Sequence, residues 1–187
     1  ISDLVGNVAE YAIGIRTIGG EIQVIRNNNA ALSTADTSVV SVEWLAIDAT
    51  SGLFKTPTFT GSSATNDYVA TTANSVRLDY AGSGITPPAT TIVATAFYST
   101  FRYGSGIAAA ALNTLRVLGI IALSGKESFA ASTGIQGINT NPYESLFTRG
   151  WNASSDESRT SLFSYRALRY RIEIQPHNGA RLCYIPE

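Results

Sequence analysis

Residues 168–175, with the sequence LRYRIEIQ, alternate strictly between apolar and polar side chains. Alternation with a period of two places one set on each face of a β-strand, so this stretch predicts a strand with one buried and one polar face. The next residues, Pro176-His177-Asn178-Gly179, are typical of a tight turn, because Asn-Gly accepts the positive φ angles of a hairpin. Residues 181–185 supply the return strand, and the sequence therefore predicts a C-terminal β-hairpin.

Further strand candidates occur along the rest of the chain. Residues 20–26 form one, although the adjacent pair Val24-Ile25 interrupts the alternation. Residues 39–47 form another, and residues 92–103 favour either a strand or a short helix followed by a strand. The side chains expected on one side of the 39–47 strand are Val40, Val42, Trp44 and Ala46. Short strands separated by clusters of Gly, Asn, Ser and Pro are typical of a β-sandwich or barrel rather than of a βαβ fold.

Residues 108–123 are ambiguous between helix and strand. The alanines at the start of this stretch and the spacing of its apolar residues suit a helix. The second half, residues 115–123, suits a strand that is buried on both faces, because Val117, Ile120 and Ile121 are β-branched. We therefore expect a strand in this second half.

The chain carries unusually little charge. Its 13 Lys and Arg and 14 Asp and Glu make up 14% of 187 residues, whereas an ordinary soluble domain has about 25%. Between Tyr80 and Gly125 the charged residues are Arg102 and Arg116 alone. A monomer uses charge to keep its surface from sticking, so the shortage predicts a subunit that neighbours cover. The net charge of −1 excludes a long-range field that would attract the whole chain to nucleic acid or to an acidic membrane.

The length fits a single domain with one hydrophobic core, residues 1–187. The single cysteine, Cys183, excludes an internal disulfide. No transmembrane span is expected, because the most apolar stretch, residues 107–123, is shorter than about 20 residues and contains polar side chains. The chain has no methionine and no secretory signal at its start, so we expect that it is cut from a longer precursor or is a fragment of one. The final residue, Glu187, is compatible with a protease that cleaves after Gln or Glu.

Catalytic chemistry finds little support. The one histidine, His177, lies in the predicted turn, and Cys183 lies on the predicted return strand. A Ser-His-Asp or Cys-His arrangement would have to use His177, for which a solvated turn residue is the favoured interpretation. One histidine and one cysteine do not form a zinc site of the usual kind. The closest acidic pair, Asp156-Glu157, lies in a stretch typical of an exposed loop. We therefore expect no enzyme, no catalytic residue, no cofactor and no metal site.

Three arginines near the C-terminus, Arg166, Arg169 and Arg171, are candidates for contact with RNA. They are interleaved with Tyr165 and Tyr170, and this combination suits phosphate contacts and base stacking. The alternative is a polar strand face that pairs with neighbouring carboxylates. This alternative is favoured, because no basic tail accompanies the arginines.

Two segments resemble the capsid proteins of picorna-like positive-strand RNA viruses, the broad group that includes insect and marine members. The first is Gly20-Glu21-Ile22-Gln23-Val24-Ile25-Arg26, a Gly-Glu followed by spaced apolar residues and an Arg, which resembles the start of the first jelly-roll strand. The second is residues 87–106, with Ala96-Phe97-Tyr98 and then Phe101-Arg102-Tyr103-Gly104-Ser105. It is similar to the helix and following strand of that family.

The resemblance implies an all-β fold, an eight-stranded antiparallel jelly-roll β-sandwich with one or two short helices, and residues 1–20 as an N-terminal arm. It implies a structural subunit of an icosahedral capsid, located in the virion and in the host cytoplasm during assembly. The expected partners are copies of this chain and sister capsid proteins, genomic RNA held weakly at the inner face, and a host receptor. The apolar 80–125 region nominates Tyr98, Phe101 and Tyr103 for the subunit interface.

Two other classes of protein remain open at this point. A β-sandwich adhesin or pilin-like surface subunit shares the low charge and the richness in Ser, Thr, Gly and Ala. A small β-rich hydrolase would require His177 to be buried beside a nucleophile.

Overall fold

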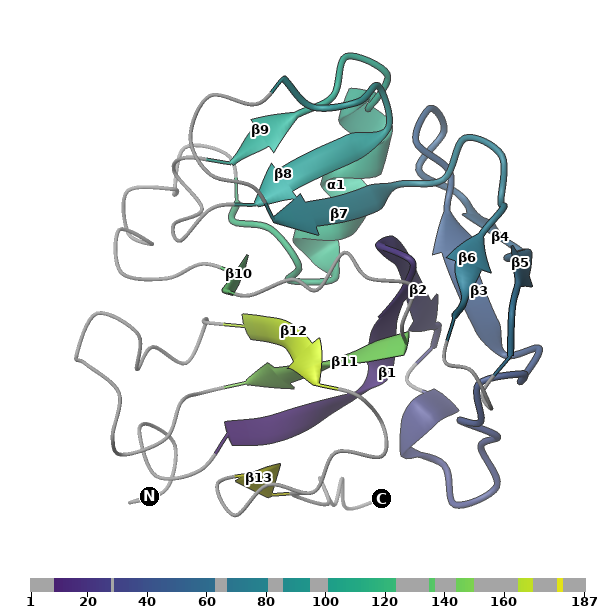
Figure 1. Cartoon of the computed structure of the whole chain (residues 1–187). Helices are drawn as coiled ribbons and strands as arrows, with labels where there is room; N and C mark the ends of the chain where they lie inside the picture. Colours follow the sequence, from purple (N-terminus) through teal and green to yellow (C-terminus); the bar gives the residue numbers. More distant parts are fainter. Residues whose placement is uncertain are drawn as a thin grey trace.

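A computed structural model describes residues 9–27, 29–62, 67–80, 86–94, 101–123, 135–136, 144–149, 165–169 and 178–179. Within these residues the chain consists mainly of short β-strands, with one α-helix and one 3-10 turn (Figure 1). The expectation of a β-rich fold with a short helix is confirmed at this level.

The strands are β1 (Ala9–Ile18), β2 (Glu21–Ile25), β3 (Trp44–Ile47), β4 (Phe54–Lys55), β5 (Phe59–Thr60), β6 (Val69–Ala70), β7 (Arg77–Tyr80), β8 (Thr91–Ala94), β9 (Arg102–Tyr103), β10 (Ile135–Gln136), β11 (Glu144–Arg149), β12 (Tyr165–Arg169) and β13 (Asn178–Gly179). The helical elements are the 3-10 turn η1 (Asn29–Ala31) and the helix α1 (Ala109–Val117).

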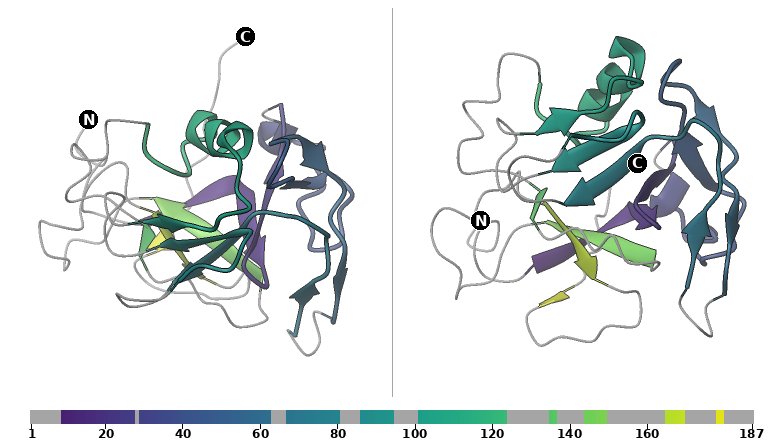
Figure 2. Two further views of the ribbon diagram at one scale, coloured as in Figure 1. Left: turned by 90° about the horizontal axis from the view of Figure 1, so that it is seen from above. Right: turned by 45° about the horizontal axis from the view of Figure 1, so that its top comes forward.

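Most of the described strands join one curled sheet in the order β10-β12-β11-β1-β2-β7-β8-β9 (Figures 1 and 2). β13 lies beside β1, β3 and β4 branch from β2, and β5 and β6 form a separate ribbon. The sheet is mixed, because β7 and β8 run parallel, as do β10 and β12, and β1 and β13. The expectation of a purely antiparallel arrangement is therefore wrong. Apolar patterning identifies a strand but carries no information on the direction of its neighbour.

The centre of the sheet is the β1–β2 hairpin. Gly19 and Gly20 have φ angles of 51° and 80°, which is the pair of positive values that a two-residue type I′ turn requires. A Cβ on Gly20 would also lie 2.9 Å from the Leu78 carbonyl oxygen. The strand predicted over residues 20–26 is confirmed as β2, and residues 9–18 of the expected N-terminal arm form β1.

The 39–47 strand prediction is wrong in its first half. β3 covers Trp44–Ile47 alone, and the preceding residues form turns in which Val40 and Val42 are exposed. The Ser41 amide donates to the Ser38 carbonyl, and the Ser41 hydroxyl accepts from the backbone N–H of residue 43. Serine side chains compete in this way with the hydrogen bonds of a sheet ladder, so the β-branched valines do not form a strand.

The strand predicted over residues 115–123 is also wrong. The helix α1 continues through Val117, and Gly119 then ends it with a φ of 70°. The backbone N–H of Ile120 donates to the Leu115 carbonyl at 2.9 Å, which is the long hydrogen bond of a Schellman C-cap. Gly119 was the signal in the sequence, and it outweighs the β-branched residues around it.

The core lies between α1 and one face of the sheet (Figure 2). Leu115 of α1 is fully buried and belongs to the same cluster as Ile22 of β2 and Ile92 of β8. The cluster consists of Ile22, Val24, Ile47, Ala49, Val76, Leu78, Ile92, Ala94, Phe101, Ile107, Ala111, Leu115, Ile120, Ile121 and Phe147. Contacts between segments far apart in the chain thus hold α1 against the sheet.

Several predictions fall partly outside the described residues. The 92–103 stretch contains the end of β8 and all of β9, while residues 95–100 lie outside. The start of the C-terminal hairpin overlaps β12, and residues 170–177 and 180–187 lie outside. Asn178–Gly179 form β13 and pair with Ala9 and Glu10 of β1, so the prediction that these two residues make a hairpin turn is wrong.

Candidate subunit interface

The residues that the sequence nominated for an interface are distributed unevenly. Phe101 lies in the core with 7% exposure and offers no free surface. Tyr103 of β9 is 38% exposed, and Tyr98 lies outside the described residues. A single exposed tyrosine does not make a contact surface, so a larger surface has to come from other residues.

The residues nominated for chemistry give no site in the described part of the chain. Arg166 and Arg169 belong to β12, where Arg166 pairs with Gln136 of β10 and Thr148 of β11. Arg171 lies outside the described residues, as do His177, Cys183 and the pair Asp156-Glu157. Within the described residues, no group of three His, Cys, Asp or Glu side chains is placed to hold a metal ion.

The most prominent surface feature is the connection between β2 and β3, residues 26–43, here called the 26–43 loop (Asn28 lies outside the described residues). β2 and β3 are antiparallel neighbours, for which a connection of 2–5 residues is enough. Connections longer than about 12–15 residues in a compact domain usually carry a function. The 26–43 loop is also internally hydrogen-bonded, for example from the Leu32 amide to the Asn29 carbonyl at 3.0 Å.

Aliphatic side chains are exposed on the 26–43 loop. Leu32 is 58% exposed, Val40 76% and Val42 88%. Single exposed aliphatic residues are common on monomers, but this one hydrogen-bonded loop carries three of them. Full burial of each by a partner would contribute about 1.5–3 kcal/mol. The loop therefore presents a surface that gains free energy when it is covered.

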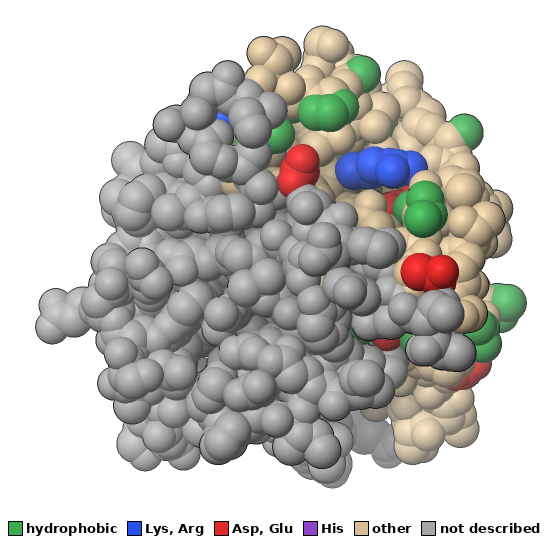
Figure 3. All heavy atoms as spheres, in the orientation of Figure 1, with side chains coloured by type: hydrophobic (Ala, Val, Ile, Leu, Met, Phe, Trp, Pro, Cys, Tyr) green, Lys and Arg blue, Asp and Glu red, His purple; other side chains and the backbone are tan. Residues whose placement is uncertain are grey.

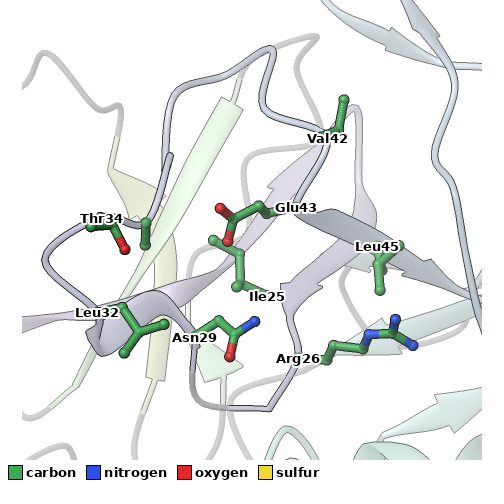
Figure 4. Close-up of a pocket in the computed structure, with 9 residues that line it drawn as sticks. Ile25, Arg26, Asn29, Leu32, Thr34, Val42, Glu43 and Leu45 are labelled. Carbon is green, nitrogen blue, oxygen red and sulfur yellow. The ribbon is translucent and has the colours of Figure 1, made fainter.

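A hollow of about 270 Å³ lies between the loop and the sheet (Figure 4). Ile25 of β2 and Leu45 of β3 contribute apolar side chains, and Leu32 lies on the far side of the hollow from Leu45. Arg26 and Glu43 add one positive and one negative charge. The complete lining is Ile25, Arg26, Asn29, Leu32, Thr34, Ala35, Val42, Glu43 and Leu45. The lining is thus mixed, with aliphatic side chains beside polar ones and two opposite charges, a composition that suits contact with another protein surface.

The buried side chain of Arg16 ties the loop to the sheet. Its Nη1 donates to the Val39 carbonyl of the loop at 3.0 Å and to Glu144 Oε1 of β11 at 2.9 Å. Its Nε donates to Gln23 Oε1 of β2 at 2.9 Å, and its guanidinium lies 4.1 Å from the centre of the Trp44 ring. Arg16 is fully buried, and a buried charge is tolerated only when it is paired and hydrogen-bonded.

The network continues on both sides of Arg16. The Gln23 amide donates to Glu21 Oε1 at 2.8 Å, and the Ser75 hydroxyl donates to the other oxygen of Glu21. On the loop side, the Trp44 indole N–H donates to the Ser38 carbonyl at 2.9 Å. The 26–43 loop is thus held at two adjacent carbonyls by side chains that are themselves fixed in the interior. Sequence reasoning missed this network, because Arg16 and Glu144 are far apart in the chain and no local pattern joins them.

A second ion pair lies outside this network, between Asp48 and Lys55, at 2.8 Å. The Lys55 ammonium and the backbone N–H of Ser51 hold the pKa of the Asp48 carboxyl well below its usual range. The same carboxylate accepts hydrogen bonds from the backbone N–H groups of Thr50 and Ser51. This cluster fixes the turn between β3 and β4, and we assign it a structural role.

No protein-family model matches the chain, and no curated protein is similar to it in sequence. Within the described residues, no helix has the length and apolarity needed to cross a membrane.

Proposed function

We propose that the chain is a structural subunit of an icosahedral viral capsid, which assembles with copies of itself and with sister capsid proteins around an RNA genome. The observation that carries the proposal is the set of exposed aliphatic side chains on a chain that is poor in charge. These side chains, in the described residues, are Leu32, Val40, Val42, Leu53, Val69, Val117 and Leu123.

A free monomer leaves these aliphatic side chains in water, which is unfavourable. Val117, at the end of α1, is 87% exposed, and the helix turn around it is fixed by the Schellman cap rather than mobile. On the face shown in Figure 3, charged side chains of the described residues are few. A surface of this kind favours association, because burial of aliphatic groups is favourable and few charges oppose contact. In an assembly with closed point symmetry, the contact surface of every subunit is covered by a neighbour, so the shell has no free edges.

The choice of a capsid over other assemblies rests on the sequence resemblance. The first resembling segment, residues 20–26, forms β2, which is buried along its length in the middle of the sheet. The second contains β8 and β9, so its described residues form two strands where the resemblance implies a helix and a following strand. A β-rich curled sheet is compatible with a jelly roll, and we propose a jelly-roll sandwich that departs from the antiparallel arrangement at the pairs β7–β8, β10–β12 and β1–β13.

The capsid proposal also assigns surfaces to RNA and to a receptor. Arg166, Arg169 and Arg171 would face the RNA at the inner side of the shell and contribute weakly. A receptor would meet the outer side. The subunit would reside in the virion, and in the host cytoplasm during assembly. The shell itself requires no catalytic group and no cofactor.

Light scattering of the purified chain and of surface variants tests the proposal. Val117→Asp and Val42→Asp each place a charge at a position that subunit contacts would cover. We therefore expect each variant to fold but to form smaller assemblies than the wild-type chain. Circular dichroism checks that the fold is retained. A wild-type chain that stays at 19.8 kDa at high protein concentration would contradict an assembly role.

A further inference from the structure

We propose that the hollow under the 26–43 loop is a two-fold contact with a second copy of this chain, in which Arg26 of each copy pairs with Glu43 of the other. This inference rests on the proposed function, because it requires that copies of the chain associate. It names the surface through which they meet.

The two charged side chains of the hollow are available to a partner. Arg26 is exposed, and no hydrogen bond or ion pair joins its guanidinium to the described part of the chain. Glu43 is half-buried, and its carboxylate accepts one hydrogen bond, from the Asp36 amide at 3.3 Å. A weak hydrogen bond to one oxygen leaves most of the accepting capacity of the carboxylate unused.

The arrangement of charges suits a second copy of this chain as the partner. A two-fold contact requires a self-complementary surface, in which residue i meets residue j and residue j meets residue i. The hollow carries one cation and one carboxylate, with Leu32 and Val42 among the apolar side chains that line it. In a dimer with its two-fold axis through the hollow, Arg26 of each copy would pair with Glu43 of the other, which gives two ion pairs. The aliphatic side chains of the two copies would lie between these pairs.

The apolar and charged parts of this contact have different roles. Burial of Val42, which is 88% exposed, and Leu32 supplies the favourable free energy. The Arg26–Glu43 pairs at the rim fix the register and exclude wrong partners, because like charges placed opposite each other weaken the contact. The buried network behind the loop keeps Val39 and Ser38 in place, so the surface is preformed and association does not require the loop to become ordered.

Charge reversal tests the proposal by sedimentation of the full chain at micromolar concentrations. Arg26→Glu alone gives two facing carboxylates at each rim position, and Glu43→Arg alone gives two facing cations. Each variant should therefore self-associate about tenfold or more weakly than wild type. An equimolar mixture of the two variants pairs the carboxylates of the Arg26→Glu chain with the guanidinium groups of the Glu43→Arg chain at both rim positions, so association should return.

The association of the single variants and of their mixture decides between a two-fold contact and other kinds of contact. Single variants that associate like wild type would overturn the proposal. Impaired single variants whose mixture stays impaired would also overturn it, because that result belongs to a head-to-tail contact with a different patch. A wild-type chain that stays monomeric would overturn it as well.

A cysteine variant gives a second readout that does not depend on charge. Val42→Cys in a Cys183→Ser background should form a disulfide-linked dimer under mild oxidation, and the matched control Thr60→Cys, at an exposed position of the β5–β6 ribbon, should not. Equal cross-linking of the two would contradict the assigned surface. Electron microscopy of the same samples separates this inference from the capsid proposal, since a dimer that never closes into particles would keep the two-fold contact and remove the shell.

Discussion

Replacement of Arg16 by methionine tests the buried network most sharply. Arg16→Met keeps most of the side-chain length but removes the guanidinium that holds Glu144, Gln23 and the Val39 carbonyl. The Glu144 carboxylate is 4% exposed, so it would be left buried without its cation. Removing one partner of a buried pair costs about 3–5 kcal/mol. Since domains of this size have about 5–15 kcal/mol of stability, the variant should be folded but far less resistant to urea.

A double variant separates the cost of an uncompensated charge from the loss of contacts. Arg16→Met with Glu144→Leu removes both charges and leaves the Val39 carbonyl and Gln23 without their donor. A buried acceptor that loses its donor costs about 1–3 kcal/mol, and the single variant bears this cost as well, so the double variant should lose less than the single variant. Urea unfolding followed by tryptophan fluorescence measures both values. Hydrogen exchange should also quicken in the 26–43 loop of Arg16→Met, because one of its two anchors is gone.

The half-buried ion pair of Lys55 and Asp48 serves as the control. Lys55 and Asp48 have side chains 29% and 20% exposed, so Lys55→Met should cost less than about 1 kcal/mol. An Arg16→Met variant that loses no more than this control, or a double variant less stable than the single one, would refute the account of the network.

Three further predictions concern stability. Lys55 lowers the pKa of Asp48 in the folded chain, so Asp48→Asn should be less stable than wild type above about pH 4. The difference in stability should shrink as pH falls below that value. Urea unfolding at several pH values measures the difference, and a difference that does not change with pH would contradict the prediction. Gly52→Ala should lose about 2 kcal/mol or more in thermal unfolding, because a Cβ there would lie 2.6 Å from a carbonyl oxygen of α1 at a φ of 70°. Leu115→Ala should lose about 2–5 kcal/mol of stability, because this side chain is fully buried. Val117 on the same helix is exposed, so Val117→Ala should change stability by less than about 0.5 kcal/mol. Equal losses in the two variants would contradict the orientation of α1.

The parts of the fold that local sequence determines were predictable. The β2 strand follows from its run of apolar and β-branched residues, and Gly19-Gly20 supplies the turn that joins it to β1. The helix in residues 108–123 was half predicted, because the alanines favour it and Gly119 ends it.

The parts that depend on distant contacts were not predictable. The alternation of Val40 and Val42 is the same whether a neighbouring strand pairs with them or not, and here they lie in the 26–43 loop. The parallel pairing of β7 and β8 has no signature in two short apolar runs. The candidate interface depends on Arg16 and Glu144 reaching each other across the sheet, which no spacing in the sequence reveals.

Electron microscopy of native material that contains this chain tests the central claim most directly. The account predicts closed isometric particles in which the chain is a stoichiometric shell protein, with its 26–43 loop at a contact between subunits. Dispersed molecules of 19.8 kDa, or open fibres with no closed shell, would contradict it.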